Sequence, residues 1–197
     1  MSDIHESGSS ALLIVDVQKD FCPGGALPVP DGDRVVDPLN RALVEAETRG
    51  WPIYASRDWH PAVTHHFKSY GGEWPPHCVQ KTDGARFHAD LRLPRTTTVI
   101  SKGQDPEESG YSAFEGFTPG GQTFLEHLED RHVRHLYVGG LATDYCVKQT
   151  VLDALRRGFE VTVLTDAIAG VEREPGDSAR AISEMRRTGA RFGEGLN

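Results

Sequence analysis

Short apolar runs that end in a polar residue or a glycine recur along this chain, and they constrain its fold more than any other feature. Runs of this kind are typical of strands that are buried on both faces of a parallel sheet. Five of them are A-L-L-I-V-D, W-P-I-Y-A-S-R-D, T-T-T-V-I-S-K, H-L-Y-V-G-G and F-E-V-T-V-L-T-D. Residues 189–192 are the candidate for a short last strand. The sequence therefore predicts a mainly parallel sheet of about six strands.

Segments with a helical spacing of apolar residues alternate with these runs. In residues 34–49 the apolar side chains fall on one face of a helix. The other predicted helices span residues 120–129, 143–157 and 176–187, and a glycine just after such a pattern is a helix stop signal. Alternating strands and helices indicate a three-layer α/β/α fold with helices on both faces of the sheet.

Length and charge narrow the class of protein. The chain has 197 residues, enough for one domain with its own core, and we expect residues 11–197 to form it after a disordered tail at 1–10. A net charge of −8 argues against nucleic-acid and anionic membrane partners. The chain has no apolar run of about 18 residues and no signal-peptide pattern, so we expect a cytoplasmic protein. A homo-oligomer is compatible with the sequence, which does not decide the oligomeric state.

Polar residues directly follow several of the predicted strands. Asp16, Asp58, Lys102 and the segment before Cys146 each follow a different strand. Ligands of such sheets bind beyond the carboxyl ends of the strands, so we expect these residues to meet at one edge. Two long loops, at residues 59–95 and 103–120, interrupt the alternating pattern. Long loops in a compact domain are usually functional.

Cys146 is the candidate nucleophile among three cysteines, an odd number that does not suggest a disulfide framework. It lies in the first turn of a predicted helix, with Thr143 or Asp144 as the expected N-cap. The helix dipole and free N–H groups there favour a thiolate and could hold an oxyanion. A buried structural cysteine is an equally good interpretation of this position alone.

Asp16 and Lys102 are an acid and an amine at the ends of strands that we expect to be neighbours. A simple ion pair is the commoner use of such residues. Near a thiol, Asp16 could take the thiol proton and deliver it to a leaving amine. Lys102 would then hold Asp16 in place and favour the anions.

Histidines are concentrated in the first long loop. Five of the nine lie between residues 60 and 88: His60, His65, His66, His77 and His88. Asp58 and His60 are two residues apart, so in an extended segment their side chains point the same way. With His66 and His77 they would suit one divalent metal, Zn²⁺, Fe²⁺ or Mn²⁺, with positions left open. A loop of surface histidines is the alternative, and the other two histidines are expected to be bystanders.

Several longer segments resemble the nicotinamidases and pyrazinamidases, which are isochorismatase-like cysteine hydrolases with a Rossmann-like fold. D-V-Q-K-D-F-C-P-G-G-A-L resembles their opening motif. R-D-W-H-P, then H-F, then W-P-P-H-C-V-Q-K-T-D-G-A-R-F-H resemble their metal-site region. S-K-G and G-Y-S-A-F-E-G resemble their lysine segment, G-G-L-A-T-D-Y-C-V-K-Q-T-V-L-D-A their nucleophile segment, and T-D-A-I-A-G-V a later strand end. The match runs from about residue 11 to residue 192 in family order.

The resemblance implies roles for individual residues. The implied catalytic triad is Asp16, Lys102 and Cys146. The implied metal ligands are Asp58, His60 and His77, with His66 as an additional ligand, and zinc is the first candidate before iron or manganese. The implied substrate-binding residues are Phe21, Trp74, Tyr111, Ala142 and Tyr145, with loop packing as the alternative for each aromatic. The peptide bond between Leu141 and Ala142 is expected to be cis, with the N–H groups of Ala142 and Cys146 as the oxyanion hole.

The activity that the resemblance implies is hydrolysis of nicotinamide to nicotinate and ammonia in NAD salvage, with pyrazinamide as a further substrate. One departure is the lysine loop G-Q-D-P-E-E-S-G-Y-S, which is acidic and longer than in the mycobacterial-type enzymes. Two alternatives stay open. One is a metal-free amidohydrolase of the same fold that acts on carbamoyl or ureido substrates, and the other is a non-catalytic metal-binding module.

Overall fold

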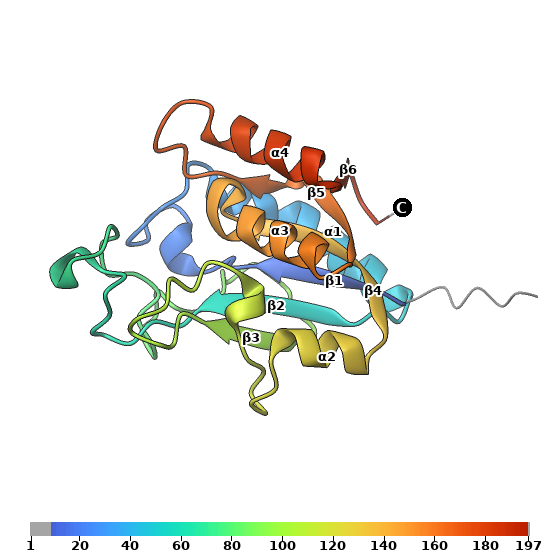
Figure 1. Cartoon of the computed structure of the whole chain (residues 1–197), viewed down its shortest axis with the longest axis horizontal. Coiled ribbons are helices and arrows are strands. Elements are labelled where there is room, and N and C mark those ends of the chain that lie inside the picture. The colour runs from blue at the N-terminus through green and yellow to red at the C-terminus, as the bar shows by residue number, and fades with distance from the viewer. Residues whose placement is uncertain (1–8, 197) are drawn as a thin grey trace, which may run out of the picture.

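One parallel sheet forms the centre of the molecule in the computed structural model, which describes residues 9–196 (Figure 1). Its order within the described residues is β3-β2-β1-β4-β5-β6, and every neighbouring pair is parallel. The strands are β1 Ser9–Val15, β2 Ile53–Asp58, β3 Thr98–Lys102, β4 Val133–Leu141, β5 Glu160–Ala169 and β6 Arg191–Gly193. The expected α/β fold with a six-stranded parallel sheet is confirmed.

Helices cover both faces of this sheet. They are α1 Val36–Thr48, α2 Phe124–Asp130, α3 Lys148–Arg156 and α4 Asp177–Thr188. Alternate residues of β1 supply the two cores, because successive side chains of a strand point to opposite faces. Leu12 and Ile14 pack with the apolar face of α1, whereas Leu13 and Val15 pack with side chains from α2, α3 and α4. The central strand is therefore buried on both sides, as its continuous apolar run predicts.

Local capping moves some boundaries away from the predicted ones. We expected a helix from residue 120, but α2 begins at Phe124 because Thr123 caps it. The Thr123 side chain accepts the N–H of Glu126, and the Glu126 carboxylate accepts the N–H of Thr123, which is a capping box. At the N-terminus, β1 already includes Ser9 and Ser10, which the sequence analysis assigned to the tail. The rest of that predicted tail lies outside the described residues.

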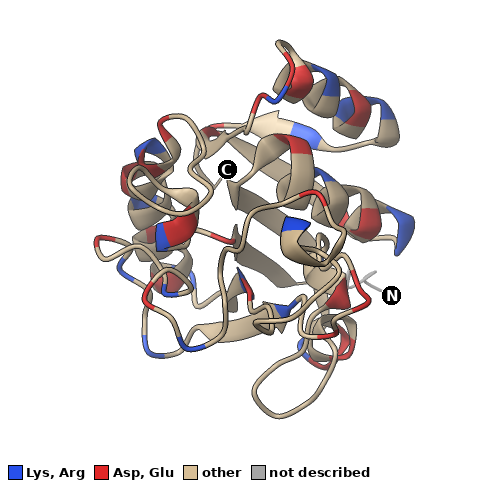
Figure 2. Cartoon of the chain, turned by 90° about the vertical axis from the view of Figure 1, so that its left-hand side faces the viewer, with Lys and Arg blue, Asp and Glu red and all other residues tan. Residues whose placement is uncertain are grey.

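The carboxyl ends of the strands and the long loops lie at the same end of the molecule, on the left of Figure 1. Figure 2 looks directly onto this end. Asp16 follows β1, while Asp58 and Lys102 are the last residues of β2 and β3. None of the helices in residues 9–196 is long and apolar enough to cross a membrane.

Candidate active site

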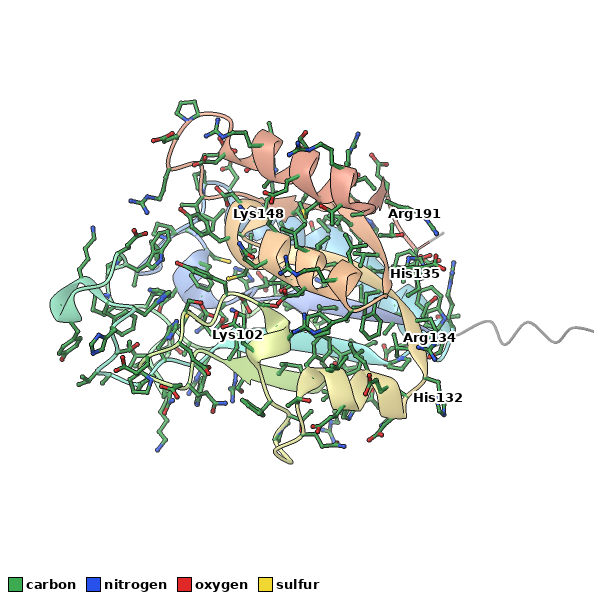
Figure 3. All side chains as sticks on the ribbon, in the orientation of Figure 1. Lys102, His132, Arg134, His135, Lys148 and Arg191 are labelled. Carbon is green, nitrogen blue, oxygen red and sulfur yellow. The ribbon has the colours of Figure 1, made fainter. Side chains whose placement is uncertain are left out.

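Lys102 is the centre of a buried charge cluster at the carboxyl edge of the sheet. In Figure 3 it is labelled at the loop end, far from the basic side chains Arg134, His135 and Arg191 at the opposite end. We expected Lys102 and Asp16 on neighbouring strands, and this is wrong, because β2 lies between β1 and β3. Asp58, at the end of β2, therefore lies beside Lys102 as well.

Lys102 bridges both carboxylates and reaches the thiol. Its Nζ lies 2.7 Å from Asp16 Oδ2 and 3.5 Å from Cys146 Sγ, and it is also in contact with Asp58 Oδ1. The same amine donates a hydrogen bond of 2.7 Å to the carbonyl of Gly110. Asp16, Lys102 and Cys146 are all buried, at 0%, 1% and 7% exposure. The structure thus brings the three predicted catalytic residues together in one place, which an isolated ion pair would not require.

The backbone around Asp16 is constrained. Asp16 has a φ of 49°, in the left-handed region that a residue other than glycine adopts at a cost. Its carbonyl accepts the N–H of Gln18 at 2.8 Å, and its Oδ1 accepts the Ser56 hydroxyl at 2.6 Å. On the neighbouring strand, a Cβ at Gly140 would lie 2.1 Å from the carbonyl oxygen of Val15, so only glycine fits there. These contacts fix the direction of the Asp16 carboxylate.

Burial and charge act against each other on these groups. Burial raises the pKa of Asp16, and the attraction of Lys102 offsets only part of this rise. Burial would raise the pKa of Asp58 too, but the adjacent Lys102 ammonium group holds it well below its usual range. Burial would lower the pKa of Lys102, yet the two carboxylates raise it well above its ordinary value. Asp16 is therefore the carboxyl that can accept and return a proton beside a charged Lys102–Asp58 pair.

Cys146 lies in a π-helical turn, Thr143–Val147, that leads into α3. The expected N-cap at Thr143 or Asp144 is wrong, since Ala142 occupies that position and its carbonyl accepts the N–H of Tyr145 and Val147. Asp144 instead accepts hydrogen bonds from the chain beyond β5. Burial raises the pKa of the Cys146 thiol well above its usual value, and Lys102 only partly opposes this. Burial therefore acts against the thiolate that we expected the start of the helix to favour.

The peptide bond between Leu141 and Ala142 is cis, as the resemblance implies. Ala142 and Cys146 line the same pocket. Their backbone N–H groups are the candidates for holding an oxyanion formed at a substrate carbon beside the thiol.

Three histidines form a second cluster next to Asp58. His60, His66 and His77 each offer a ring nitrogen, and these atoms lie within 4.8 Å of one another. The rings of His60 and His66 are stacked with centroids 4.5 Å apart. Asp58 Oδ2 lies 3.6 Å from His60 Nε2 and 3.8 Å from His77 Nε2. His66, which lies in the 59–95 loop, thus comes close to Asp58, His60 and His77, the three metal ligands that the resemblance implies first.

The hydrogen bonds of these histidines test whether the cluster fits a metal ion. His60 Nδ1 lies 3.0 Å from the Gly103 carbonyl, and His77 Nδ1 lies 2.8 Å from the Pro75 carbonyl. Each carbonyl fixes the tautomer with the proton on Nδ1, so that Nε2 is free to act as a ligand. His60 Nε2 is buried and has no hydrogen-bond partner among residues 9–196. A buried nitrogen without a partner, next to two imidazoles and a carboxylate, fits a divalent transition metal.

Two further observations support that fit. A Cβ at Gly103 would lie 2.5 Å from His60 Cε1, so the glycine of the S-K-G segment leaves room for this ring. Burial, reinforced by the neighbouring histidines, lowers the pKa of His66 to about 3, which keeps its imidazole neutral as metal binding requires.

The two histidines that we expected to be bystanders, His65 and His88, lie elsewhere. The mostly exposed His65 is 3.3 Å from Glu107, and His88 Nδ1 accepts the N–H of Asp90.

Aromatic side chains from four segments surround a pocket beside the thiol. Phe21, Trp74, Tyr111 and Tyr145 line it together with Ala142, Cys146, Asp58, His66 and His77. Trp74 Nε1 donates a hydrogen bond of 2.8 Å to the Tyr111 hydroxyl. The Trp74 and Tyr145 rings meet edge to face, with centroids 5.0 Å apart. The remaining wall is aliphatic and comes from Leu27, Val29 and Val171, which the sequence analysis did not assign.

Two buried polar residues also escaped the sequence analysis. Gln18 donates from its side-chain amide to the Asp58 carbonyl at 2.8 Å and accepts the Asp58 N–H at 2.8 Å, so it clamps the backbone of that residue. Ser56 donates to Asp16, as described above. For Ser56 the signal in the sequence is a polar residue two positions before Asp58 on a buried strand, which places both side chains on the same side of that strand.

Comparison with known proteins identifies the family. The isochorismatase domain model matches residues 10–194, and the chain belongs to that family. It is 45% identical to the nicotinamidase of Escherichia coli (strain K12), over 91% of this chain and 92% of that protein. It is 40% identical to the nicotinamidase/pyrazinamidase of Mycobacterium tuberculosis (strain ATCC 25618 / H37Rv), over 89% and 94%. The crystal structure of pyrazinamidase of Pyrococcus horikoshii in complex with zinc matches with a TM-score of 0.87 and 43% identity, covering 94% of this chain and 99% of that one.

Proposed function

We propose that this protein is a nicotinamidase, which hydrolyses nicotinamide to nicotinate and ammonia with Cys146 as the nucleophile and serves NAD salvage. The observation that carries the proposal is the buried cluster in which Lys102 Nζ lies 2.7 Å from Asp16 Oδ2 and 3.5 Å from Cys146 Sγ, with Cys146 lining an aromatic pocket. Extensive identity to relatives named nicotinamidase supports the same activity. Pyrazinamide, a ring amide of the same size, is the expected second substrate.

The first half of the reaction forms a thioester. Asp16 takes the proton from the Cys146 thiol as the sulfur attacks the carboxamide carbon. The N–H groups of Ala142 and Cys146 stabilise the negative charge that develops on the carbonyl oxygen. Asp16 then gives its proton to the amide nitrogen, the carbon–nitrogen bond breaks, and ammonia leaves. The Lys102 ammonium group holds Asp16 and Cys146 in place, and its positive charge stabilises the negative charge on these two groups.

The second half releases the acid. Asp16 accepts a proton from water, whose oxygen attacks the thioester carbon. When the tetrahedral intermediate collapses, the carbon–sulfur bond breaks, Cys146 recovers its proton from Asp16, and nicotinic acid leaves and loses its carboxyl proton to the solvent to give nicotinate. The raised pKa of Asp16 suits a group that alternates between base and acid near neutral pH.

A divalent transition metal, with zinc as the first candidate and iron or manganese as others, is the group that His60, His66, His77 and Asp58 would hold. Bound there, it would offer an open position to a pyridine ring nitrogen and so contribute to binding the substrate. The zinc complex of the related pyrazinamidase supports this choice. Trp74, Tyr111 and Tyr145 would pack against the ring and limit the access of solvent to it.

The test is ammonia release from nicotinamide, measured with and without a chelator, and compared with benzamide. Benzamide carries the same amide but lacks the ring nitrogen, so it should be a poor substrate. We expect activity on nicotinamide to fall after chelation and to return when metal is added. Equal rates on both amides, unaffected by the chelator, would favour the metal-free amidohydrolase instead. No release from any amide, with metal bound, would favour the non-catalytic module.

We also propose a cytoplasmic location, no nucleic-acid or membrane partner, and a single domain that begins near residue 11.

A further inference from the structure

An aromatic partition separates the pocket from an open groove on the surface. Trp74, Tyr111 and His66 line the pocket beside Cys146, and the same three residues line the neighbouring groove. On its outer side the groove is bordered by acidic residues of two loops, among them Glu73. The width of the pocket therefore depends on how firmly these rings are held.

Contacts among the rings hold the partition together. Trp74 Nε1 donates to the Tyr111 hydroxyl at 2.8 Å, and the Trp74 and Tyr145 rings meet at an angle of 83°. The centroids of Tyr111 and Tyr145 lie 5.9 Å apart. The three aromatic residues come from three different loops, so the partition stays closed only while those loops keep their relative positions.

Arg173 packs against the partition from the outside. Its Cζ lies 5.2 Å from the centroid of the Trp74 ring, and its Nη1 lies 3.2 Å from Glu73 Oε2. The guanidinium thus contacts two neighbouring residues of the 59–95 loop, and the Trp74 ring beside it meets Tyr145 edge to face. None of the assigned catalytic or metal-binding residues touches it in the contacts described.

The backbone that carries Arg173 is itself anchored to the nucleophile turn. Both oxygens of the Asp144 carboxylate accept N–H groups, from Val171 and Glu172, at 2.9 Å each. Asp144 is two residues from Cys146, so the loop between β5 and α4 is tied to the reacting group. In Figure 1 this loop turns toward the same end of the molecule as the 59–95 loop.

We propose that Arg173 is a specificity-determining residue, which closes the pocket around single-ring amides by holding Trp74 in place against Tyr145. This inference rests on the proposed function. With the ring nitrogen toward the histidines and the carboxamide toward Cys146, ring carbon 5 is the position that points away from both. A bulky group on carbon 5 would therefore require the partition to open. Removing the guanidinium should make such amides better substrates relative to nicotinamide.

The experiment compares ammonia release from nicotinamide and from 5-phenylnicotinamide in the wild type and in Arg173→Ala. We expect the ratio of kcat/KM for the bulky amide over that for nicotinamide to rise about tenfold in the variant. Arg173→Lys keeps the charge but loses the flat face that stacks on the indole, so its ratio should lie in between. This second variant carries the test if Arg173→Ala does not fold.

Arg186→Ala is the matched control, because its guanidinium lies 4.7 Å from the Phe192 ring, in a similar pair that involves α4 and β6. Arg186→Ala should leave the kcat/KM ratio of the two amides unchanged. If Arg173 were merely structural, Arg173→Ala and Arg186→Ala would both lower the thermal stability, and neither would change that ratio. Hydrogen exchange of the Trp74 indole N–H, assigned with Trp74→Phe, should be faster in Arg173→Ala. The same substrate ratio in Arg173→Ala and wild type overturns the inference. A wild type that releases no ammonia from nicotinamide contradicts the proposed function instead, and the exchange measurement still tests the contact.

Discussion

The groups at the ends of the strands and the groups on the loops differ in how they are held. Asp16, Asp58 and Lys102 are at most 4% exposed, and each is fixed by the strand that it ends or follows and by its neighbours in one charge cluster. His66 and Tyr111 come from long loops and remain partly exposed. Their positions depend on ring contacts and on the hydrogen bond that Trp74 donates to Tyr111 rather than on a ladder of backbone hydrogen bonds.

This difference indicates a division of labour. A parallel sheet holds the reacting groups rigidly, and proton transfer and nucleophilic attack need such fixed geometry. Loops can vary in length and sequence without disturbing the sheet, so they suit the shape of the pocket. Changes at the strand ends should therefore affect the chemical step most, and changes in the loops should affect binding and selectivity.

The largest effect is expected for Cys146→Ala. The thiol forms the covalent bond to the substrate, and no other nucleophile among the pocket-lining residues replaces it. We expect kcat to fall about 10⁴-fold or more, with an unchanged circular dichroism spectrum and melting temperature. Ammonia release under saturating nicotinamide measures the loss.

Cys22→Ala is the control for this substitution, since Cys22 is another buried thiol outside the pocket. It should retain most activity, and a substrate adduct trapped on the wild type should be found at Cys146 by mass spectrometry. An adduct at Cys22 or Cys78 would show that the nucleophile is misassigned.

Asp16→Asn should be the next most damaging change. The amide keeps the shape of the carboxylate but cannot accept the thiol proton or return it to the leaving nitrogen. We expect kcat to fall about 10³-fold while KM changes little. Single-turnover kinetics should show that formation of the thioester is the slow step. Turnover close to that of the wild type would contradict the role of Asp16 as the base.

His60→Ala and His66→Ala probe the boundary between the two regions. His60 lies two residues beyond the end of β2 and is fully buried, with Nδ1 held by the Gly103 carbonyl, whereas His66 reaches the cluster from farther along the loop. Elemental analysis of purified protein should find about one metal ion per wild-type chain and close to none in His60→Ala. His66→Ala should keep the ion but bind it more weakly in a chelator titration.

The neighbouring His65→Ala is the control, because that side chain is exposed and pairs only with Glu107 in the contacts described. It should bind metal like the wild type. Equal metal content in all three variants would contradict the assignment of the site. If His66→Ala bound the metal ion more weakly than His60→Ala, the loop would contribute more to metal binding than the strand end, contrary to our expectation.

The fold could be predicted because its signals are local. The continuous apolar run of β1, buried on both faces, and the helical spacing of α1 are visible within short windows of sequence. The order of the strands is not local, since it depends on which helices cover which face. For this reason Lys102 was placed beside Asp16, whereas the structure inserts β2 between their strands.

The site could be predicted in its residue types but not in its connections. Asp16, Asp58, Lys102 and Cys146 follow strands in a recognisable way, and the resemblance adds the histidines. The contact of Lys102 with Asp58, which links the histidine cluster to the thiol, follows only from the strand order. The raised pKa of Cys146 follows from burial, and burial at a loop-covered strand end is a property of the whole fold. Arg173 gives no signal at all, because an arginine in a polar loop resembles any other surface residue.

The smallest effect, and the sharpest test of the loop region, is the coupling between Trp74 and Tyr111. Trp74→Phe removes the N–H that donates to the Tyr111 hydroxyl but keeps an aromatic ring in the wall, and Tyr111→Phe removes the acceptor. A neutral hydrogen bond of this kind contributes about 1 kcal/mol, so each single variant should raise KM for nicotinamide about fivefold and leave kcat nearly unchanged. The double variant should be no worse than the poorer single variant, because the two substitutions remove the same interaction. Steady-state kinetics of all four proteins gives the coupling energy directly. If the effects of the two substitutions add fully, the wall is not held by this hydrogen bond. If kcat falls with KM unchanged, the loops contribute to the chemical step, and the contrast between the two regions is wrong.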